Sequence, residues 1–292
     1  MERVKFGIQK SGRLTEKSLD LLRNCGYEID DPHRKIIVSS ENSNLDAFFL
    51  RDDDIPHYIL QGLCDFGIVG LNLIEEKFNK EINSNKLKVV QKLPFGKCRL
   101  SLAFKPNEEV DSLSDINGKT IATSYPNILK RILDRKKISV QVKELRGGVE
   151  IAPIIKMADG IFDIVSSGGT LRAHGLKEYF TLMESQCVIV SSSNLSEAAS
   201  FFIAGLLKRI KSHLIARKKS YIMLNVSKPN LDKVIDILPG ADSPSIIELS
   251  SNREMVSVHA LTKKEVVWET MEKLKEFGAS NILVMPVDKM ME

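Results

Sequence analysis

The chain has 292 residues, of which 42 are basic and 38 acidic, giving a net charge of +4. Hydrophobic residues make up 43% and charged residues 27%, which is typical of a soluble globular protein of two or three domains. This balance of charge gives no indication of nucleic-acid binding, and it is compatible with a local basic cleft for an anionic small molecule.

The four cysteines are widely spaced, and no Cys/His cluster predicts a zinc site. We therefore expect reduced, packed thiols in a cytoplasmic protein. The first residues predict a strand rather than a signal peptide, and no stretch approaches the roughly 20 apolar residues of a membrane-spanning helix.

The first hundred residues alternate between strand and helix patterns, which favours an α/β layer with a largely parallel sheet. A helix over 14–25 ends at Gly26, a residue type favoured just past helix ends, and Pro56 lies in the first turn of another helix. The expected strands span 4–9, 36–38, 47–50, 66–69, 88–92 and 99–104.

A second α/β unit begins near residue 105. Two such lobes would leave a cleft between them, and ligands of these folds bind outside the carboxyl ends of the strands. The expected elements are an opening strand at 118–122, helices over 128–134 and 149–158, strands over 140–145 and 161–165, and returning strands over 180–183 and 187–190.

The tail begins with a long amphipathic helix over 195–219, followed by a β-α-β-β-α-β order over 221–286. That order predicts a ferredoxin-like domain, and about 70 residues are enough for it to fold independently. We expect a discontinuous first domain of residues 1–104 with 184–222, a second domain of residues 105–183, and a C-terminal domain of residues 223–292.

The segment DIVSSGGTL at 163–171 is the most informative one, because a buried strand runs into small polar residues and then into a helix start. Glycines allow a positive φ and a close backbone approach to a ligand, while amides and hydroxyls can converge on a phosphate. The spacing matches neither the P-loop nor the dinucleotide fingerprint, so an ordinary Ser/Gly-rich turn stays an open alternative. The residues concerned are Asp163, Ser166, Ser167, Gly168, Gly169 and Thr170.

Basic residues follow two other strands, at Lys10 and Arg13 after the first strand and at Arg51 after a later one, and Arg99 starts a further strand. Guanidinium groups bind phosphate through paired hydrogen bonds, and Lys acts as a compact charge. If these four side chains share a cleft with the phosphate loop, they predict a site for a polyphosphate. The alternative is that each one is a solvated surface charge.

Acidic residues stand at two points near these motifs. Asp52, Asp53 and Asp54 precede a helix, where they would cap its N-terminus or help to hold Mg²⁺ through water. Asp163 lies at the start of the phosphate loop, where its carboxylate would accept hydrogen bonds from sugar hydroxyls or from the turn itself. The five histidines are scattered and predict no catalytic triad.

These motifs together resemble the long form of ATP phosphoribosyltransferase, the enzyme of the first step of histidine biosynthesis. The resemblance extends over nearly the whole chain in the right order, although Leu71 stands where many relatives carry a polar or acidic residue. The matching segments are QKSGRL at 9–14, FLRDDDIP at 49–56, DFGIVG at 65–70, GKCRLSL at 96–102, DIVSSGGTL at 163–171, LPGADSP at 238–244 and EFGASNIL at 276–283.

The resemblance implies a bilobal catalytic core like that of periplasmic binding proteins, with a C-terminal regulatory domain that binds histidine. It implies that ATP condenses with phosphoribosyl pyrophosphate to give N1-(5-phosphoribosyl)-ATP and pyrophosphate, with Mg²⁺ and without a protein nucleophile. It also implies a homohexamer in equilibrium with dimers, without a separate regulatory subunit.

On this interpretation the phosphate loop and Asp163 bind phosphoribosyl pyrophosphate. The four basic residues Lys10, Arg13, Arg51 and Arg99 bind ATP and pyrophosphate, and histidine binds near Ser245 and Ala279. The metal ligands are not identified by the pattern. Two rival hypotheses are a non-enzymatic solute-binding module and a phosphoribosyltransferase for a different base.

Overall fold

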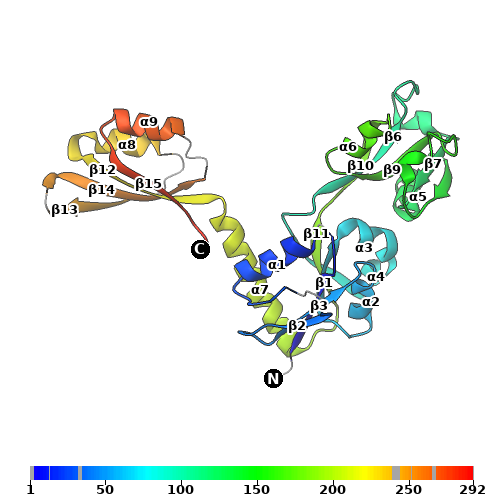
Figure 1. The fold of residues 1–292 in the computed structure, drawn as a ribbon, viewed down its shortest axis with the longest axis horizontal. Coiled ribbons are helices and arrows are strands. Elements are labelled where there is room, and N and C mark those ends of the chain that lie inside the picture. Colours follow the sequence, from blue (N-terminus) through cyan, green and yellow to red (C-terminus); the bar gives the residue numbers. More distant parts are fainter. Residues whose placement is uncertain are drawn as a thin grey trace. The chain divides into compact units, whose positions relative to one another are not determined.

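The computed structural model describes residues 3–12, 14–31, 35–238, 244–250, 252–264 and 268–291. Arg13 and residues 239–243 of the LPGADSP segment, both singled out above, lie outside the described residues. The chain divides into two compact units, Met1–Phe202 and Ile203–Glu292 (Figure 1). Within the described ranges, no helix combines the length and the apolar character that crossing a membrane requires.

The first unit contains two sheets, and the first of these has the strand order β2-β3-β1-β4-β11-β5. Strand β1 runs parallel to β3 and β4, whereas the β2–β3, β4–β11 and β11–β5 pairs are antiparallel. The sheet is therefore mixed rather than largely parallel, because a short connection from β2 to β3 permits only antiparallel pairing. Its strands are β1 (Val4–Gln9), β2 (Ile37–Ser39), β3 (Leu45–Leu50), β4 (Phe66–Gly70), β5 (Leu87–Lys92) and β11 (Cys187–Ser192).

Helices cover this sheet with apolar side chains. Ile55 and Ile59 of α2 (Ile55–Leu60) are fully buried in a core that also contains Val69 of β4. A Cβ at Gly67 would lie 2.2 Å from a methyl carbon of Ile55, so only glycine lets α2 approach β4 this closely. The other helices are α1 (Thr15–Asn24), α3 (Leu71–Lys77) and α4 (Asn79–Asn83).

The second sheet has the order β10-β6-β9-β7-β8. Strand β6 pairs with β9 and β10 and so belongs to the second sheet, although we expected it in the first domain, within residues 1–104. A strand's sheet is decided by its distant hydrogen-bond partners, which the local pattern of β6 does not reveal. The strands are β6 (Cys98–Phe104), β7 (Thr120–Thr123), β8 (Gln141–Glu144), β9 (Gly160–Val165) and β10 (Lys177–Ser185), with helices η1 (Leu113–Ile116), α5 (Pro126–Arg135) and α6 (Gly169–Ala173).

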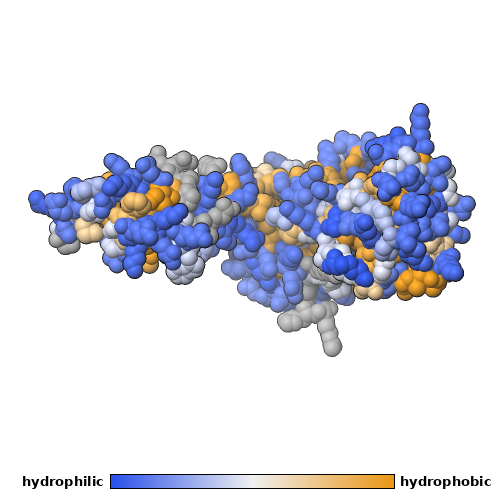
Figure 2. Space-filling view, turned by 90° about the horizontal axis from the view of Figure 1, so that it is seen from above, coloured by the Kyte–Doolittle hydropathy of each residue, from blue (hydrophilic) through white to orange (hydrophobic). Residues whose placement is uncertain are grey.

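The helix expected over 149–158 is wrong. Only a 3₁₀ turn, η2 (Val149–Ile151), forms, and turns follow it. Pro153 cannot donate the backbone hydrogen bond that an α-helix would need at that position. Ile154 and Ile155 of this segment are among the exposed apolar residues of the chain. The face of the molecule seen in Figure 2 is mostly hydrophilic, with apolar patches.

The C-terminal unit confirms the expected β-α-β-β-α-β order, with antiparallel strands arranged β13-β14-β12-β15. Side chains of β12 alternate in burial, and Ile222, Leu224 and Val226 pack with Val234 and Leu274 of the two helices. Helix α7 contains the boundary between the units. The elements are α7 (Glu197–Ala216), β12 (Lys219–Ser227), η3 (Lys228–Asn230), α8 (Leu231–Ile237), β13 (Ser245–Leu249), β14 (Asn252–Lys263), α9 (Trp268–Glu276) and β15 (Ser280–Pro286).

Candidate functional site

The basic residues that follow β1 and β3 lie side by side. Gln9 is in register with Leu50, and the Lys10 amide donates a 2.7 Å hydrogen bond to the Leu50 carbonyl. Lys10 and Arg51 therefore emerge together at the carboxyl end of neighbouring parallel strands, and both are exposed. The structure brings these two predicted residues together, as the strand pattern indicated.

A cleft of about 620 Å³ opens at the carboxyl ends of strands from both sheets. Arg51 and Asp52 line it from the end of β3, Asn72 from the residues after β4, and Tyr125 from the residues after β7. A ligand in this cleft would be contacted by both sheets of the first unit, as expected for α/β folds. The remaining lining residues are Asp53, Leu73, Glu76, Lys77, Ser124, Glu144, Leu145 and Arg146.

The phosphate loop has the backbone conformation that its glycines predicted. Gly168 has a φ of +74°, and helix α6 begins at Gly169. Ser166, Ser167, Gly169 and Thr170 are exposed, so their hydroxyls and backbone can be reached by a ligand. The loop follows β9, which is paired with β6 and β7 and is therefore held on both sides.

Arg99 binds the backbone of this loop at Ser166. Its Nε and Nη2 atoms each lie 2.5 Å from an oxygen of Glu178, and its Nη1 donates a 3.0 Å hydrogen bond to the Ser166 carbonyl. The hydrogen bond from Arg99 holds the pKa of Glu178 below its ordinary value, and burial opposes this shift. With three nitrogens so engaged, Arg99 is placed to hold the loop, and its contact with ATP or pyrophosphate stays a prediction.

Asp163 lies on β9 and is half-buried. Its Oδ1 accepts a 2.8 Å hydrogen bond from the Ile164 amide, which lowers its pKa less than burial raises it. Burial also raises the pKa of Tyr125, and the charge of Asp163 adds to that shift. The parallel pairing of Thr123 with Phe162 brings the end of β7, which Tyr125 follows, beside Asp163 on β9.

The structure adds cleft residues that the sequence analysis did not single out. The Asn72 side-chain amide donates to the Tyr125 hydroxyl at 3.3 Å, and its Oδ1 accepts from Ser185 at 3.0 Å. Ser124 also lines the cleft. Asn72 follows a predicted strand by three residues and Ser124 follows another by two, so the rule that ligands bind at carboxyl ends of strands could have found them.

The three aspartates after β3 have separate surroundings. Asp53 pairs with Lys77 at 2.6 Å, and Asp52 accepts a 3.0 Å hydrogen bond from the Asp53 amide. Asp54 occupies the N-cap position of α2 without a side-chain capping bond. No cluster of three His, Cys, Asp or Glu side chains suited to a metal occurs within the described ranges. Mg²⁺ commonly binds one or two carboxylates together with substrate phosphates, so Asp52 in the cleft fits such a shared site.

The two residues expected near histidine do not share one site within a chain. Ser245 lies in β13 and Ala279 immediately precedes β15, and these strands form opposite edges of the sheet. Three strand spacings separate them by about 14 Å or more. Ala279 instead lines a mostly apolar hollow of about 460 Å³ with the exposed Trp268 and the half-buried Met271 of α9.

Comparisons with known proteins agree with this architecture. A family model described as ATP phosphoribosyltransferase matches residues 51–212, and a model described as the C-terminal domain of that family matches residues 216–289. A solved chain of the ATP phosphoribosyl transferase (HisG:HisZ) complex from Thermotoga maritima is 26% identical at a TM-score of 0.57, covering 71% of this chain and 98% of that one.

The chain is also similar to the periplasmic aliphatic sulphonate binding protein SsuA from Escherichia coli, with 16% identity, a TM-score of 0.49 and 72% of each chain covered. The alkanesulfonate-binding protein SsuA from Xanthomonas axonopodis matches at 16% identity and a TM-score of 0.45, again over 72% of each chain. The two consecutive family matches decide the classification: this chain belongs to the ATP phosphoribosyltransferase family of histidine biosynthesis, in the long form that includes the C-terminal domain.

Proposed function

We propose that this enzyme condenses ATP with phosphoribosyl pyrophosphate to form N1-(5-phosphoribosyl)-ATP and pyrophosphate. The observation that carries the proposal is the exposed Ser166–Thr170 loop, with its positive φ at Gly168, held at the end of β9 by Arg99. Its amides and hydroxyls suit the 5-phosphate of the sugar. Family membership supplies the reaction class.

The proposed reaction breaks the bond between C1 and pyrophosphate as N1 of adenine bonds to C1. Positive charge develops on the ribose ring and negative charge on the leaving group, so positioning and charge stabilisation supply the catalysis. Asp163 would hold the ribose hydroxyls, while Lys10 and Arg51 would neutralise pyrophosphate and ATP phosphates. Mg²⁺, when bound to the pyrophosphate and Asp52, would supply further charge neutralisation.

We further propose feedback inhibition by histidine through the C-terminal unit, within a homohexamer that exchanges with dimers. The Thermotoga maritima chain matches 71% of this one, and the C-terminal family match lies at the end of this chain. Histidine inhibition requires a different affinity for histidine in two states of the enzyme. The separation of Ser245 from Ala279 favours a site that uses one of them, or one residue from each of two subunits.

The direct test is incubation of the protein with ATP, phosphoribosyl pyrophosphate and Mg²⁺, with mass spectrometry to detect the adduct. Formation of phosphoribosyl-ATP together with one pyrophosphate per adduct supports the proposal. If ATP is returned unchanged while another nucleobase, added in its place, is ribosylated, the chain is a phosphoribosyltransferase of different specificity.

Asp163→Asn is expected to stabilise the unliganded protein and weaken substrate binding. Burial raises the pKa of Asp163 above its ordinary value of 3.8, so ionisation is harder in the folded state and costs stability above that pH. The neutral amide should raise the unfolding free energy at pH 7 by about 0.5–2 kcal/mol. As the pH falls below 3.8 the gain should shrink, because the carboxyl is then increasingly protonated in both states.

Urea unfolding of both proteins at pH 7 and at pH 3.5 measures this gain. Calorimetry with phosphoribosyl pyrophosphate should show weaker binding by Asp163→Asn. A variant that is less stable than the wild type at pH 7 would contradict the assignment of burial as the dominant cause.

Arg99→Ala is expected to act on the loop rather than on ATP. Without Arg99, the Ser166 carbonyl loses its 3.0 Å donor and Glu178 loses its partner. Misplacement of a substrate-positioning loop should raise the KM for phosphoribosyl pyrophosphate about 10–100-fold. Steady-state kinetics that show a rise confined to the KM for ATP would contradict this role and support a contact of Arg99 with ATP.

A further inference from the structure

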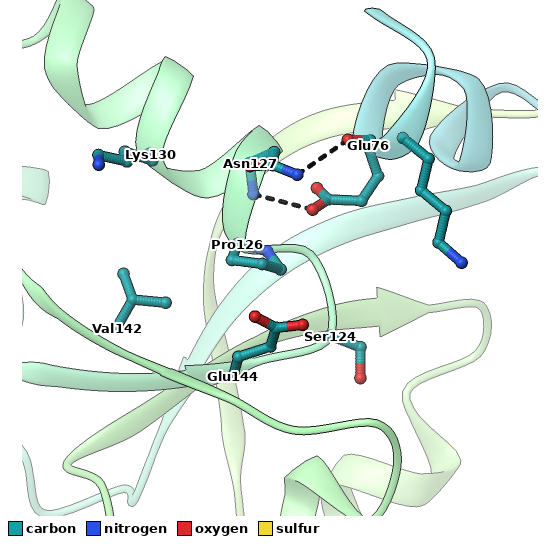
Figure 3. Close-up of a pocket in the computed structure, with 8 residues that line it drawn as sticks. Glu76, Ser124, Pro126, Asn127, Lys130, Val142 and Glu144 are labelled. Carbon is teal, nitrogen blue, oxygen red and sulfur yellow. Dashed lines mark hydrogen bonds between the residues drawn. The ribbon is translucent and has the colours of Figure 1, made fainter.

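Helix α5 begins without a cap of its own. Its N-cap residue, Tyr125, makes no side-chain capping bond, and Pro126 occupies the first turn. The backbone amides of Asn127 and Ile128 instead donate to the two carboxylate oxygens of Glu76, at 2.9 and 2.8 Å. The Asn127 side chain also donates to the Glu76 carbonyl at 3.1 Å (Figure 3).

This cap crosses from one sheet of the first unit to the other. Glu76 belongs to α3, which follows β4 of the first sheet, whereas α5 follows β7 of the second. The preceding residue, Glu75, makes a second crossing contact, because Arg131 of α5 donates to its carbonyl at 3.1 Å and to its Oε2 at 2.7 Å. Asn72, four residues before Glu76 on the same helical face, reaches Tyr125.

The chemistry of the cap requires a carboxylate. Glu76 is only 6% exposed, and both of its oxygens accept backbone N–H groups at the positive end of α5. A glutamine at this position has the same shape but offers one acceptor oxygen and one NH₂ group, which can only donate. Its NH₂ group would face one of the two amides, and a buried unmatched donor is destabilising.

The cap lies beside the cleft, because Glu76 itself is one of the lining residues. Ser124 and Tyr125, the residues just before α5, line the cleft that Arg51 and Asp52 line from the first sheet. Figure 3 shows Glu76 reaching the start of α5 beside Ser124 and Glu144. A shift of α5 relative to α3 would therefore change the spacing between the strand ends of the two sheets.

We propose that Glu76 is a positioning residue, which fixes the width of the cleft by capping α5 across the two sheets. This inference rests on the proposed function, because the width matters where ATP and phosphoribosyl pyrophosphate must meet at reacting distance. The phosphate loop and Asp163 both lie on the second sheet, so binding of the sugar 5-phosphate and ribose hydroxyls should not depend on the cap. The pyrophosphate is expected toward Lys10 and Arg51 of the first sheet, so its contacts should depend on the cap.

The test compares Glu76→Gln with Asp134→Asn, which neutralises an exposed carboxylate at the other end of α5. Glu76→Gln should lower kcat about 10–100-fold. Calorimetry with ribose 5-phosphate, which lacks the pyrophosphate, should show an affinity within about threefold of wild type, a change below 1 kcal/mol. Glu76→Asp, which keeps two acceptor oxygens, should recover part of the loss, and Asp134→Asn should match the wild type.

Two outcomes would overturn the inference. One is a folded Glu76→Gln with wild-type kcat. The other is a loss of ribose 5-phosphate affinity equal to the loss of kcat, which would indicate general destabilisation. If Glu76→Gln does not fold, Arg131→Met removes the second crossing contact and should show the same split between kcat and binding. A wild-type enzyme that forms no adduct would count against the proposed function, whatever the variants do.

Discussion

The double variant Gly169→Val/Thr170→Ala is expected to lose phosphoribosyl pyrophosphate binding and to remain folded. Thr170 is exposed and supplies a hydroxyl, and a valine at Gly169 would project into the space that the phosphate is expected to occupy. A Cβ at Gly169 meets only the Ser167 Oγ, at an ordinary 3.5 Å, so the fold has room for the change. Loss of hydrogen bonds to a charged group should weaken binding at least about 100-fold.

Titration calorimetry measures the affinity, and thermal unfolding shows whether the variant is folded. Gly205→Ala, on α7, is the matched control, because it also adds a side chain at a glycine. A Cβ at Gly205 would meet no other side chain within 4 Å. It should bind like the wild type. Wild-type affinity of the double variant would exclude the loop as the phosphate site.

Removal of residues 219–292 is expected to abolish histidine inhibition while adduct formation continues. The cut must precede β12, because Ile222, Leu224 and Val226 are fully buried in the core of the C-terminal unit. A cut at Ser227 would leave these three side chains without their partners. Truncation before Lys219 leaves α7 intact.

The inhibition is measured by adding histidine to the full-length and truncated enzymes at equal substrate saturation. Inhibition should be complete for the full chain and absent for the truncated one. A truncated, folded enzyme that is still inhibited by histidine would place the inhibitory site in the first unit. Loss of adduct formation with truncation would instead assign the C-terminal unit to assembly of the active form.

Much of the fold was predictable because the spacing of apolar residues along the chain reflects which side chains are buried. The alternating pattern of β12 and the β-α-β-β-α-β order identified the C-terminal unit, and the glycines of the phosphate loop predicted the positive φ at Gly168. Lys10 and Arg51 were predicted at strand ends, and the parallel pairing of β1 with β3 makes them neighbours.

The remaining features depend on contacts between residues far apart in the chain. The sheet to which β6 belongs, the role of Arg99 beneath the loop and the cap that Glu76 gives to α5 all come from such contacts. A single sequence shows the donors and acceptors of these residues but does not show which ones meet. The helix expected over 149–158 is different, since Pro153 already argued against it.

A crystal structure of the enzyme with phosphoribosyl pyrophosphate and Mg²⁺ tests the central claim most directly. We expect the 5-phosphate to accept hydrogen bonds from the Ser166–Thr170 loop, with the ribose hydroxyls on Asp163 and the pyrophosphate toward Lys10 and Arg51. A structure in which the sugar phosphate lies elsewhere, with the loop bound only to water, would contradict the assignment of the site.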